Sequence, residues 1–312
     1  MKEEFTINLL AIALVIVLLV ILFPLELLSY HRRYKQLSKK YNQLKEEHNI
    51  IKYHHHNVQR AEPIDFLIIT TLREEYNAVL SKFSNIREID NSQSEVKILT
   101  TKNFTYHVVI VCLSSLKEKM GPVIAAIKTT AWLNDKQPKN VLLVGIAGGV
   151  KGKSDLGDIL IPEKIVDASV GKVIEGEKIT DYEMYEPDDE LFEKTVLTNW
   201  SDFLKEKRPK NGTSSIIRGL VISSGEVIAD LKKVNSYQKT WRKMSGFEME
   251  GAAVAVAIKH VERQTGFLMI RAISDFGDEN KEDDKKWRAY AFDVAASYTR
   301  AFIESSPVQP LN

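Results

Sequence analysis

The stretch Val141-Leu-Leu-Val-Gly-Ile-Ala-Gly-Gly149 decides the fold class. Its first four residues are apolar without interruption, which is typical of a strand buried on both faces of a sheet. Such a strand needs helices on both sides of its sheet. The glycines that follow let backbone come close to a ligand. They lack the G-x-G-x-x-G spacing of a dinucleotide site and the G-K-[ST] ending of a P-loop, so neither site is predicted.

Short apolar runs that alternate with helical patterns surround this strand. Further strands are expected at Asp65–Thr70, Val96–Thr101, Tyr106–Leu113, Ile159–Ile161, Leu220–Ser223 and Phe267–Ile273. Helices are expected at Arg73–Phe83, Val123–Leu133, Asp189–Trp200, Met249–Gln264 and Lys286–Glu304. This alternation predicts an α/β fold, a three-layer α/β/α sandwich formed by residues 62–308 as one domain. The polar stretches Gly176–Asp189 and Glu206–Ser215 are expected to be long loops.

The N-terminal residues differ sharply in composition from this domain. Phe5 to Leu25 contains no charged residue, and 21 helical residues would span roughly 31 Å, about one hydrocarbon thickness. Residues 5–28 are therefore predicted to be a retained transmembrane helix in contact with membrane lipid. A cleaved signal peptide is the alternative, but the start Met-Lys-Glu-Glu is not basic and no small-residue cleavage site follows.

Charge predicts the orientation of this helix. Basic residues crowd its C-terminal flank at Arg32, Arg33, Lys35, Lys39, Lys40 and Lys45. Because basic flanks stay on the cytoplasmic side, we expect a single-pass membrane protein whose C-terminal domain is cytoplasmic. Residues 29–61 repeat apolar or aromatic side chains at spacings of three and four, which predicts a helical stalk. Either a coiled coil or a lone amphipathic helix fits this pattern.

Overall composition excludes other classes of protein. The 43 Lys and Arg against 42 Asp and Glu leave a net charge of +1, so no nucleic-acid partner is expected. Cys112 is the single cysteine and lies in an apolar run, which favours a buried thiol and a reducing compartment. The sequence lacks H-E-x-x-H, paired C-x-x-C and G-x-S-x-G motifs, which removes the commonest zinc-hydrolase and serine-hydrolase interpretations. His54, His55 and His56 would point in different directions on a helix, so no metal site is predicted there.

Polar or glycine-rich residues follow four of the predicted strands, where ligands of open α/β sheets bind. They are Arg73-Glu-Glu75, Gly145–Gly149, Ser224-Gly-Glu226 and Ser274-Asp275, and a fifth group, Phe247-Glu-Met-Glu-Gly251, opens a helix. Taken singly, each carboxylate is more often a helix cap or a first-turn acid than a functional group. Their conjunction and order favour a functional site.

Five motifs occur in order along residues 64–304. They are Ile68-Ile-Thr-Thr-Leu-Arg-Glu-Glu75, Val144-Gly-Ile-Ala-Gly-Gly149 with Leu156-Gly-Asp158, Ser223-Ser-Gly-Glu226, Phe247-Glu-Met-Glu-Gly-Ala252 and Ile270-Arg-Ala-Ile-Ser-Asp275. Together they resemble the nucleoside phosphorylase superfamily, and within it the methylthioadenosine/S-adenosylhomocysteine nucleosidase-like proteins. The resemblance implies a central mixed sheet, a homodimer, no cofactor, and hydrolysis of the N-glycosidic bond of a purine nucleoside or nucleotide to free base and a ribosyl product.

The resemblance also implies catalytic roles. Asp275 matches the general acid that protonates N7 of the departing purine, and Ser274 is placed to orient it. Glu75 matches the base that positions or deprotonates the attacking water, with Arg271 as an arginine near that water. Glu250 matches the residue that binds the ribose 2′ and 3′ hydroxyls.

The substrate-binding residues show two departures from the family. The predicted set is Met249, which packs on the sugar, with Ser274, Glu248, Ile146, Gly148 and Ile228. Ile146 stands where the nucleosidases usually have a hydroxyl residue. Their base-stacking aromatic falls near Val227 or Ile228, which are aliphatic here, so another residue must stack on the base.

Three other functions stay open at this point. A phosphate-dependent phosphorylase is the first, although phosphorylases of this superfamily gather arginines and a serine around phosphate, and the glycine run with Ile146 offers little of that. A non-catalytic nucleoside sensor is the second. The third, suggested by resemblance alone, is an anti-phage effector that depletes a nucleotide pool.

Overall fold

The computed structural model describes residues 64–311, except 91–92, 115–120, 170, 175–176, 181, 198, 262–263 and 279–283. The predicted transmembrane helix at 5–28 and the predicted stalk at 29–61 lie outside the described residues. Among the residues that are described, no helix combines the length and the apolar character needed to cross a membrane.

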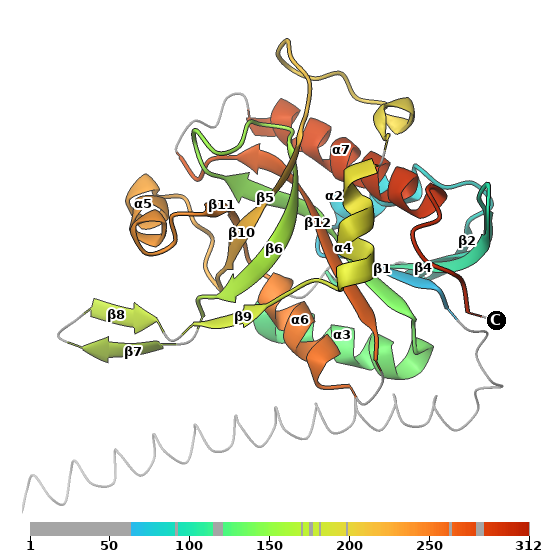
Figure 1. The fold of residues 1–312 in the computed structure, drawn as a ribbon, viewed down its shortest axis with the longest axis horizontal. Coiled ribbons are helices and arrows are strands. Elements are labelled where there is room, and N and C mark those ends of the chain that lie inside the picture. Colours follow the sequence, from blue (N-terminus) through green and yellow to red (C-terminus); the bar gives the residue numbers. More distant parts are fainter. Residues whose placement is uncertain are drawn as a thin grey trace, which may run out of the picture. The chain divides into compact units, whose positions relative to one another are not determined.

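The described residues form one mixed ten-stranded sheet (Figure 1). Its strands are β1 (Phe66–Thr70), β2 (Arg87–Asp90), β3 (Gln93–Thr100), β4 (Thr105–Cys112), β5 (Asn140–Gly149), β6 (Ile159–Asp167), β9 (Glu183–Tyr185), β10 (Ile216–Ser223), β11 (Met244–Glu248) and β12 (Gly266–Asp275). Their order is β11-β10-β6-β12-β5-β1-β4-β3-β2, with β9 paired to β6. Strands β4, β1, β5 and β12 run parallel, whereas β2, β3 and β4 pair antiparallel. The sheet is therefore mixed, as the resemblance implied.

One half of the sheet closes on itself. Strand β11 pairs with β10 and also, antiparallel, with β5, where Phe247 lies opposite Gly148. Since β5, β12, β6 and β10 are neighbours in turn, these five strands form a ring. The close approach requires glycine, because a Cβ on Gly148 would lie 2.2 Å from the Phe247 ring. The closure brings the ends of β5, β11 and β12 together.

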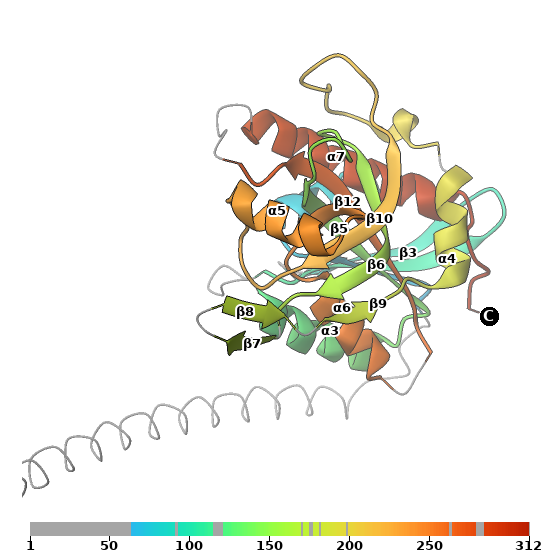
Figure 2. The same cartoon turned by 60° about the vertical axis from the view of Figure 1, so that its left-hand side comes forward.

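Helices cover both faces of the sheet (Figures 1 and 2). They are α2 (Arg73–Leu80), α3 (Pro122–Lys136), α4 (Asp189–Glu193), α5 (Leu231–Thr240), α6 (Gly251–Lys259) and α7 (Asp284–Glu304). Side chains alternate along the buried strands, so Ile68 and Leu142 pack toward α2 and α7 while Leu67 and Leu143 pack toward α3 and α6. The two resulting cores confirm the predicted α/β layers.

Several element boundaries differ from the sequence predictions. The expected loop Gly176–Asp189 contains β9 and also β8 (Glu177–Thr180), which forms a hairpin with β7 (Gly171–Ile174). The helix expected over Asp189–Trp200 ends at Glu193 and continues as 3₁₀ turns at Lys194–Leu197 and Ser201–Phe203. Arg218 explains this early end, because its Nη2 donates 2.7 Å hydrogen bonds to the Phe192 carbonyl and the Thr195 hydroxyl. Helix α6 is also shorter than expected, and α5 and β11 were not predicted.

Candidate active site

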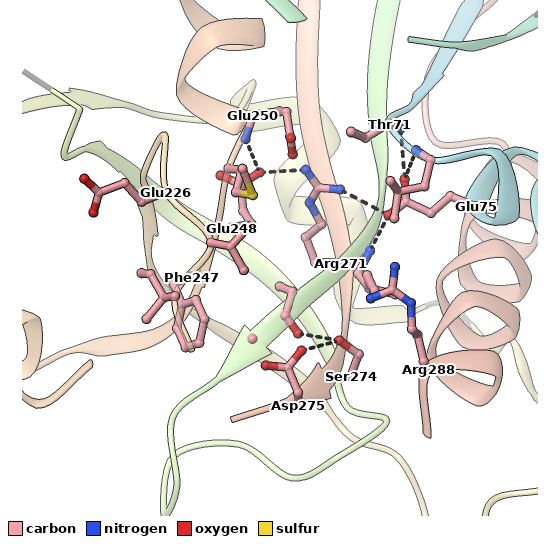
Figure 3. Close-up of a pocket in the computed structure, with 17 residues that line it drawn as sticks. Thr71, Glu75, Glu226, Phe247, Glu248, Glu250, Arg271, Ser274, Asp275 and Arg288 are labelled. Atoms are coloured by element: carbon pink, nitrogen blue, oxygen red, sulfur yellow. Dashed lines mark hydrogen bonds and ion pairs between the residues drawn. The ribbon is translucent and has the colours of Figure 1, made fainter. Parts of the chain in front are cut away.

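A cavity of about 390 Å³ opens where β5, β11 and β12 end, beside the first turn of α2 (Figure 3). All ten residues singled out from the sequence line it, namely Glu75, Ile146, Gly148, Ile228, Glu248, Met249, Glu250, Arg271, Ser274 and Asp275. The role of each residue stays a prediction. Their meeting in one cavity follows from the closure of the sheet, since they come from segments as far apart in the chain as Glu75 and Asp275.

Arg271 is the central cation of the cavity. Its Nη2 donates to Glu248 Oε2 at 2.6 Å, and its Nη1 lies 4.0 Å from Glu75 Oε1 (Figure 3). Burial disfavours the charge on Arg271, but Glu248, Glu75 and Glu250 more than offset this effect and raise its pKa. Arg271 is therefore a fixed positive charge between two acidic residues.

Glu75 is held by backbone donors on two sides. Its Oε2 accepts hydrogen bonds from the amides of Thr71 and Leu72 at 2.9 and 2.8 Å, and its Oε1 accepts one from the Ile146 amide at 3.0 Å. The side chain stands in the first turn of α2, where a carboxylate suits the free N–H groups. Burial raises the pKa of Glu75, although Arg271 and the three amides oppose the shift. An oriented carboxylate whose pKa is raised is a stronger base than an ordinary glutamate, and it is therefore suited to accept a proton.

Glu248 fastens the start of α6 to the cavity. It accepts hydrogen bonds from the amides of Glu250 and Gly251 as well as from Arg271. These contacts fix the segment that carries Met249 and Glu250 along the cavity wall. Glu248 thus orients its neighbours and has little remaining capacity to accept hydrogen bonds from a ligand.

Glu250 is a buried carboxyl that is open to a ligand. It is 6% exposed, and no group in the described part of the chain hydrogen-bonds its side chain. Burial and the nearby charge of Glu248 raise the pKa of Glu250 to about 8. A carboxyl in this state favours neighbours that donate hydrogen bonds or bring positive charge.

Asp275 is oriented by its neighbours at the end of β12. The Ser274 hydroxyl lies 2.8 Å from Asp275 Oδ2, and the Gly277 amide donates to Oδ1 at 2.9 Å (Figure 3). Gly277 has a φ of +66°, which lets the chain turn sharply after the strand. The Asp275 carboxyl is half-buried, so it can reach a ligand in the cavity.

The cavity also contains residues to which sequence reasoning gave no role. Phe247 is buried against Gly148 and supplies an aromatic ring, whereas Val227 is 78% exposed. Thr71 lines the cavity with a buried hydroxyl that has no partner in the described part of the chain. Both lie inside the quoted motifs, which therefore pointed to them. Arg288 on α7 also lines the cavity, and no motif pointed to it.

Among the described residues, no group of three His, Cys, Asp or Glu is arranged to hold a metal ion.

Comparison with known proteins identifies relatives of this chain. The model of the phosphorylase superfamily matches residues 65–304. A 5′-methylthioadenosine/S-adenosylhomocysteine nucleosidase of Desulfotalea psychrophila is 27% identical over 221 residues, which are 70% of this chain and 86% of the relative. The ATP nucleosidase Cap17 of Escherichia coli is 28% identical over 208 residues, 61% of this chain but only 39% of that longer protein.

Solved structures share the fold. The nucleosidase of Neisseria meningitidis in complex with methylthio-immucillin-A superposes with a TM-score of 0.59 at 19% identity. The match covers 77% of this chain and 99% of the other. The arrangement of strands and helices described above is thus that of a known family.

Proposed function

Because the chain belongs to the phosphorylase superfamily, we propose that its cavity hydrolyses the N-glycosidic bond of a purine nucleoside or nucleotide. The relatives are nucleosidases, which are N-glycosyl hydrolases, and this makes the same reaction class the expected one here. The observation that carries the proposal is the convergence of three acidic groups, Glu75, Glu250 and Asp275, on one cavity around Arg271. A mere binding site has no need of a positioned acid and a positioned base.

The reaction uses these groups in two linked transfers. Asp275 gives its proton to N7 of the purine while the bond from C1′ to N9 breaks and its electron pair stays with the base. A water oxygen then bonds to C1′, and Glu75 accepts the proton that this water loses. Exchange with solvent returns the proton of Glu75 to water and reprotonates Asp275. The net products are the free base and a ribosyl product that carries the new hydroxyl.

Glu250 suits the sugar half of the substrate. Its carboxyl has free hydrogen-bonding capacity for the 2′ and 3′ hydroxyls of ribose. As C1′ becomes positive in the transition state, the ionised form of Glu250 becomes favoured despite its burial. The site therefore binds the transition state better than the ground state, which is what catalysis requires.

Phe247 and Ile228 offer an apolar surface for the base. Phe247 lies against Gly148 and close to Gly277, where a Cβ would come within 2.8 Å of the ring. Both residues line the cavity, as Asp275 does. An aromatic ring from β11 thus takes the place of the aromatic residue that is missing at Val227 and Ile228.

Water is favoured over phosphate as the nucleophile. Arg271 is already paired with Glu248 and Glu75, so it has no spare charge for a phosphate dianion beside C1′. Ile146 contributes only its amide, and that amide is used by Glu75. A phosphate next to Glu75 would also meet like charge.

Base release from a substrate panel tests this function. The full chain is incubated with adenosine, inosine, methylthioadenosine, S-adenosylhomocysteine, AMP and ATP, with and without inorganic phosphate, and free base is followed by chromatography. Release without phosphate supports hydrolysis. Release only with phosphate would show a phosphorylase, and binding without release from any substrate would show a sensor.

We also propose that residues 5–28 anchor the enzyme in a membrane with its domain on the cytoplasmic side. The support is the uncharged run from Phe5 to Leu25 and the basic residues that follow it. An intact anchor keeps the chain in the membrane fraction after alkaline extraction. Recovery of the full chain in the supernatant would refute the anchor.

A further inference from the structure

Arg288 is a charged group in the cavity that the proposed reaction does not use. It stands in the second turn of α7, is exposed, and lines the cavity together with Glu75 and Asp275. No ion pair or hydrogen bond joins Arg288 to any other described residue. Its guanidinium lies 5.3 Å from the ring centre of Phe292 on the same helix. Within the described part of the chain, Arg288 is therefore a positive charge with no acidic partner, although the cavity contains several carboxylates.

The contrast with Arg271 shows what Arg288 is suited for. Arg271 is 1% exposed and has its charge balanced by Glu248 and Glu75. Arg288 keeps its full donor capacity, and a planar guanidinium binds phosphate through paired hydrogen bonds. An unpaired arginine at the edge of a substrate cavity is thus suited to an anionic part of the substrate.

The place of Arg288 matches the 5′ end of a bound nucleoside. This step rests on the proposed function, in which the purine meets Asp275 and the ribose hydroxyls meet Glu250. In ribonucleosides the 5′ carbon leaves the sugar on the face opposite the 2′ and 3′ hydroxyls, so it points away from Glu250. Figure 3 shows Arg288 on the side of Arg271 that is remote from Glu250, and both arginines line the cavity.

We propose that Arg288 binds the 5′-phosphate of the substrate, so that the enzyme acts on purine nucleotides in preference to unphosphorylated nucleosides. A phosphate group could also come from free inorganic phosphate, which would make Arg288 part of a phosphorylase site. The carboxylate of Glu75 disfavours that source, because a free phosphate would have to reach C1′ beside it. A phosphate tethered through the 5′ carbon is held away from C1′.

The test compares substrates in matched variants of the full chain. Arg288→Gln removes the charge at similar length, Arg288→Lys keeps it, and Lys285→Gln removes an equal charge from an exposed position of α7 outside the cavity. The readout is the ratio of kcat/KM for AMP to kcat/KM for adenosine. The wild-type enzyme favours AMP, and Arg288→Gln lowers the ratio by about 10- to 100-fold, as expected for loss of one charge-assisted hydrogen-bonded pair. Arg288→Lys recovers part of the ratio, and Lys285→Gln leaves it unchanged.

Several results would overturn this inference. The first is a wild-type preference for adenosine. The second is an equal loss of kcat/KM on AMP and adenosine in Arg288→Gln. The third is base release that rises with inorganic phosphate, with a KM for phosphate that increases in Arg288→Gln. Thermal unfolding of each variant shows whether it is folded. If Arg288→Gln does not fold, the test is the ratio of kcat/KM values in Arg288→Lys, which should lie below the wild-type ratio. If no substrate releases base, the proposed function itself fails. Release that ignores the 5′-phosphate refutes only the role of Arg288.

Discussion

Arg271 Nη2 lies 2.6 Å from Glu248 Oε2, and the two side chains are 1% and 3% exposed. The pair joins β12 to the start of α6, because Glu248 also accepts the Gly251 amide at 2.8 Å. The ion pair thus positions Glu250, which follows Glu248 by two residues. The same arginine also lies beside Glu75, so one side chain contacts both Glu248 and the proposed base.

We expect Glu248→Gln to destabilise the protein by about 2 to 4 kcal/mol, because it leaves the buried charge of Arg271 poorly compensated. Urea unfolding measures the change. Glu186→Gln is the control, since Glu186 forms a 2.8 Å pair with Lys164 whose side chains are 64% and 49% exposed. Glu186→Gln should lower the free energy of unfolding by less than about 1 kcal/mol. Equal effects of the two substitutions would contradict a structural role for the Arg271–Glu248 pair.

Asp275→Asn tests the proposed general acid. Asparagine keeps the shape of the side chain but cannot transfer a proton, so base release should fall by about 10²- to 10⁴-fold. Ser274→Ala removes one hydrogen bond to Asp275 and should lower the rate of base release about 10-fold. Initial rates of base release on a good substrate measure both effects, with unfolding curves to show that the variants fold. Turnover of Asp275→Asn within a few-fold of wild type would exclude this residue as the acid.

Gly145→Ala tests the close packing of the backbone against Arg271 and Glu75. A Cβ at Gly145 would lie 2.3 Å from both Arg271 Nη1 and Glu75 Oε1. Both groups are buried and held by several partners, so the methyl group must push them apart, at a cost of about 1 to 3 kcal/mol. Base release should fall with stability, because Glu75 moves. Gly225→Ala is the control. A Cβ at Gly225 would have Pro122 Cγ as its nearest atom, at 3.4 Å, so the unfolding free energy should change by less than about 0.5 kcal/mol.

Much of the fold could be predicted from the sequence, because strands that are buried on both faces of the sheet consist of uninterrupted apolar residues. The apolar run from Val141 to Val144 has this character, and the strand lies inside the sheet between β1 and β12. The positions of Glu75 and Asp275 followed from a general property of parallel sheets, whose strand ends meet at one edge. Local sequence patterns therefore sufficed for these elements.

Other features depend on contacts between residues that are distant in sequence, and the local sequence alone did not predict them. The antiparallel pairing of Phe247 with Gly148 closes the ring of strands and puts an aromatic ring into the cavity. Arg288 shares its helix with Lys285 and Lys286, and spacing alone does not say which of the three reaches the cavity. The early end of α4 depends on Arg218, which comes from β10. Each case required the tertiary structure.

The raised pKa of Glu250, about 8, makes stability depend on pH. An ordinary glutamate in the unfolded chain loses its proton near pH 4.5, whereas the folded protein keeps the proton of Glu250 up to about pH 8. The folded state therefore holds the extra proton between these values, and its stability falls as pH rises through that window. The contribution of Glu250 is fully present below pH 4.5 and is lost above pH 8.

Glu250→Gln should remove this dependence and with it the activity. The amide is neutral at every pH, so the variant resembles wild type at pH 5 and exceeds it at pH 9 by about 2 to 5 kcal/mol in unfolding free energy. Urea unfolding at the two pH values measures this difference, and Glu74→Gln, an exposed glutamate in the same turn as Glu75, is the control. Base release should be lost, because the amide cannot supply the negative charge that stabilises a positive C1′. A variant that is more stable at high pH and inactive would show that burial of this acid trades stability for catalysis. A pH-independent difference would show that Glu250 ionises in the folded protein as it does in the unfolded chain.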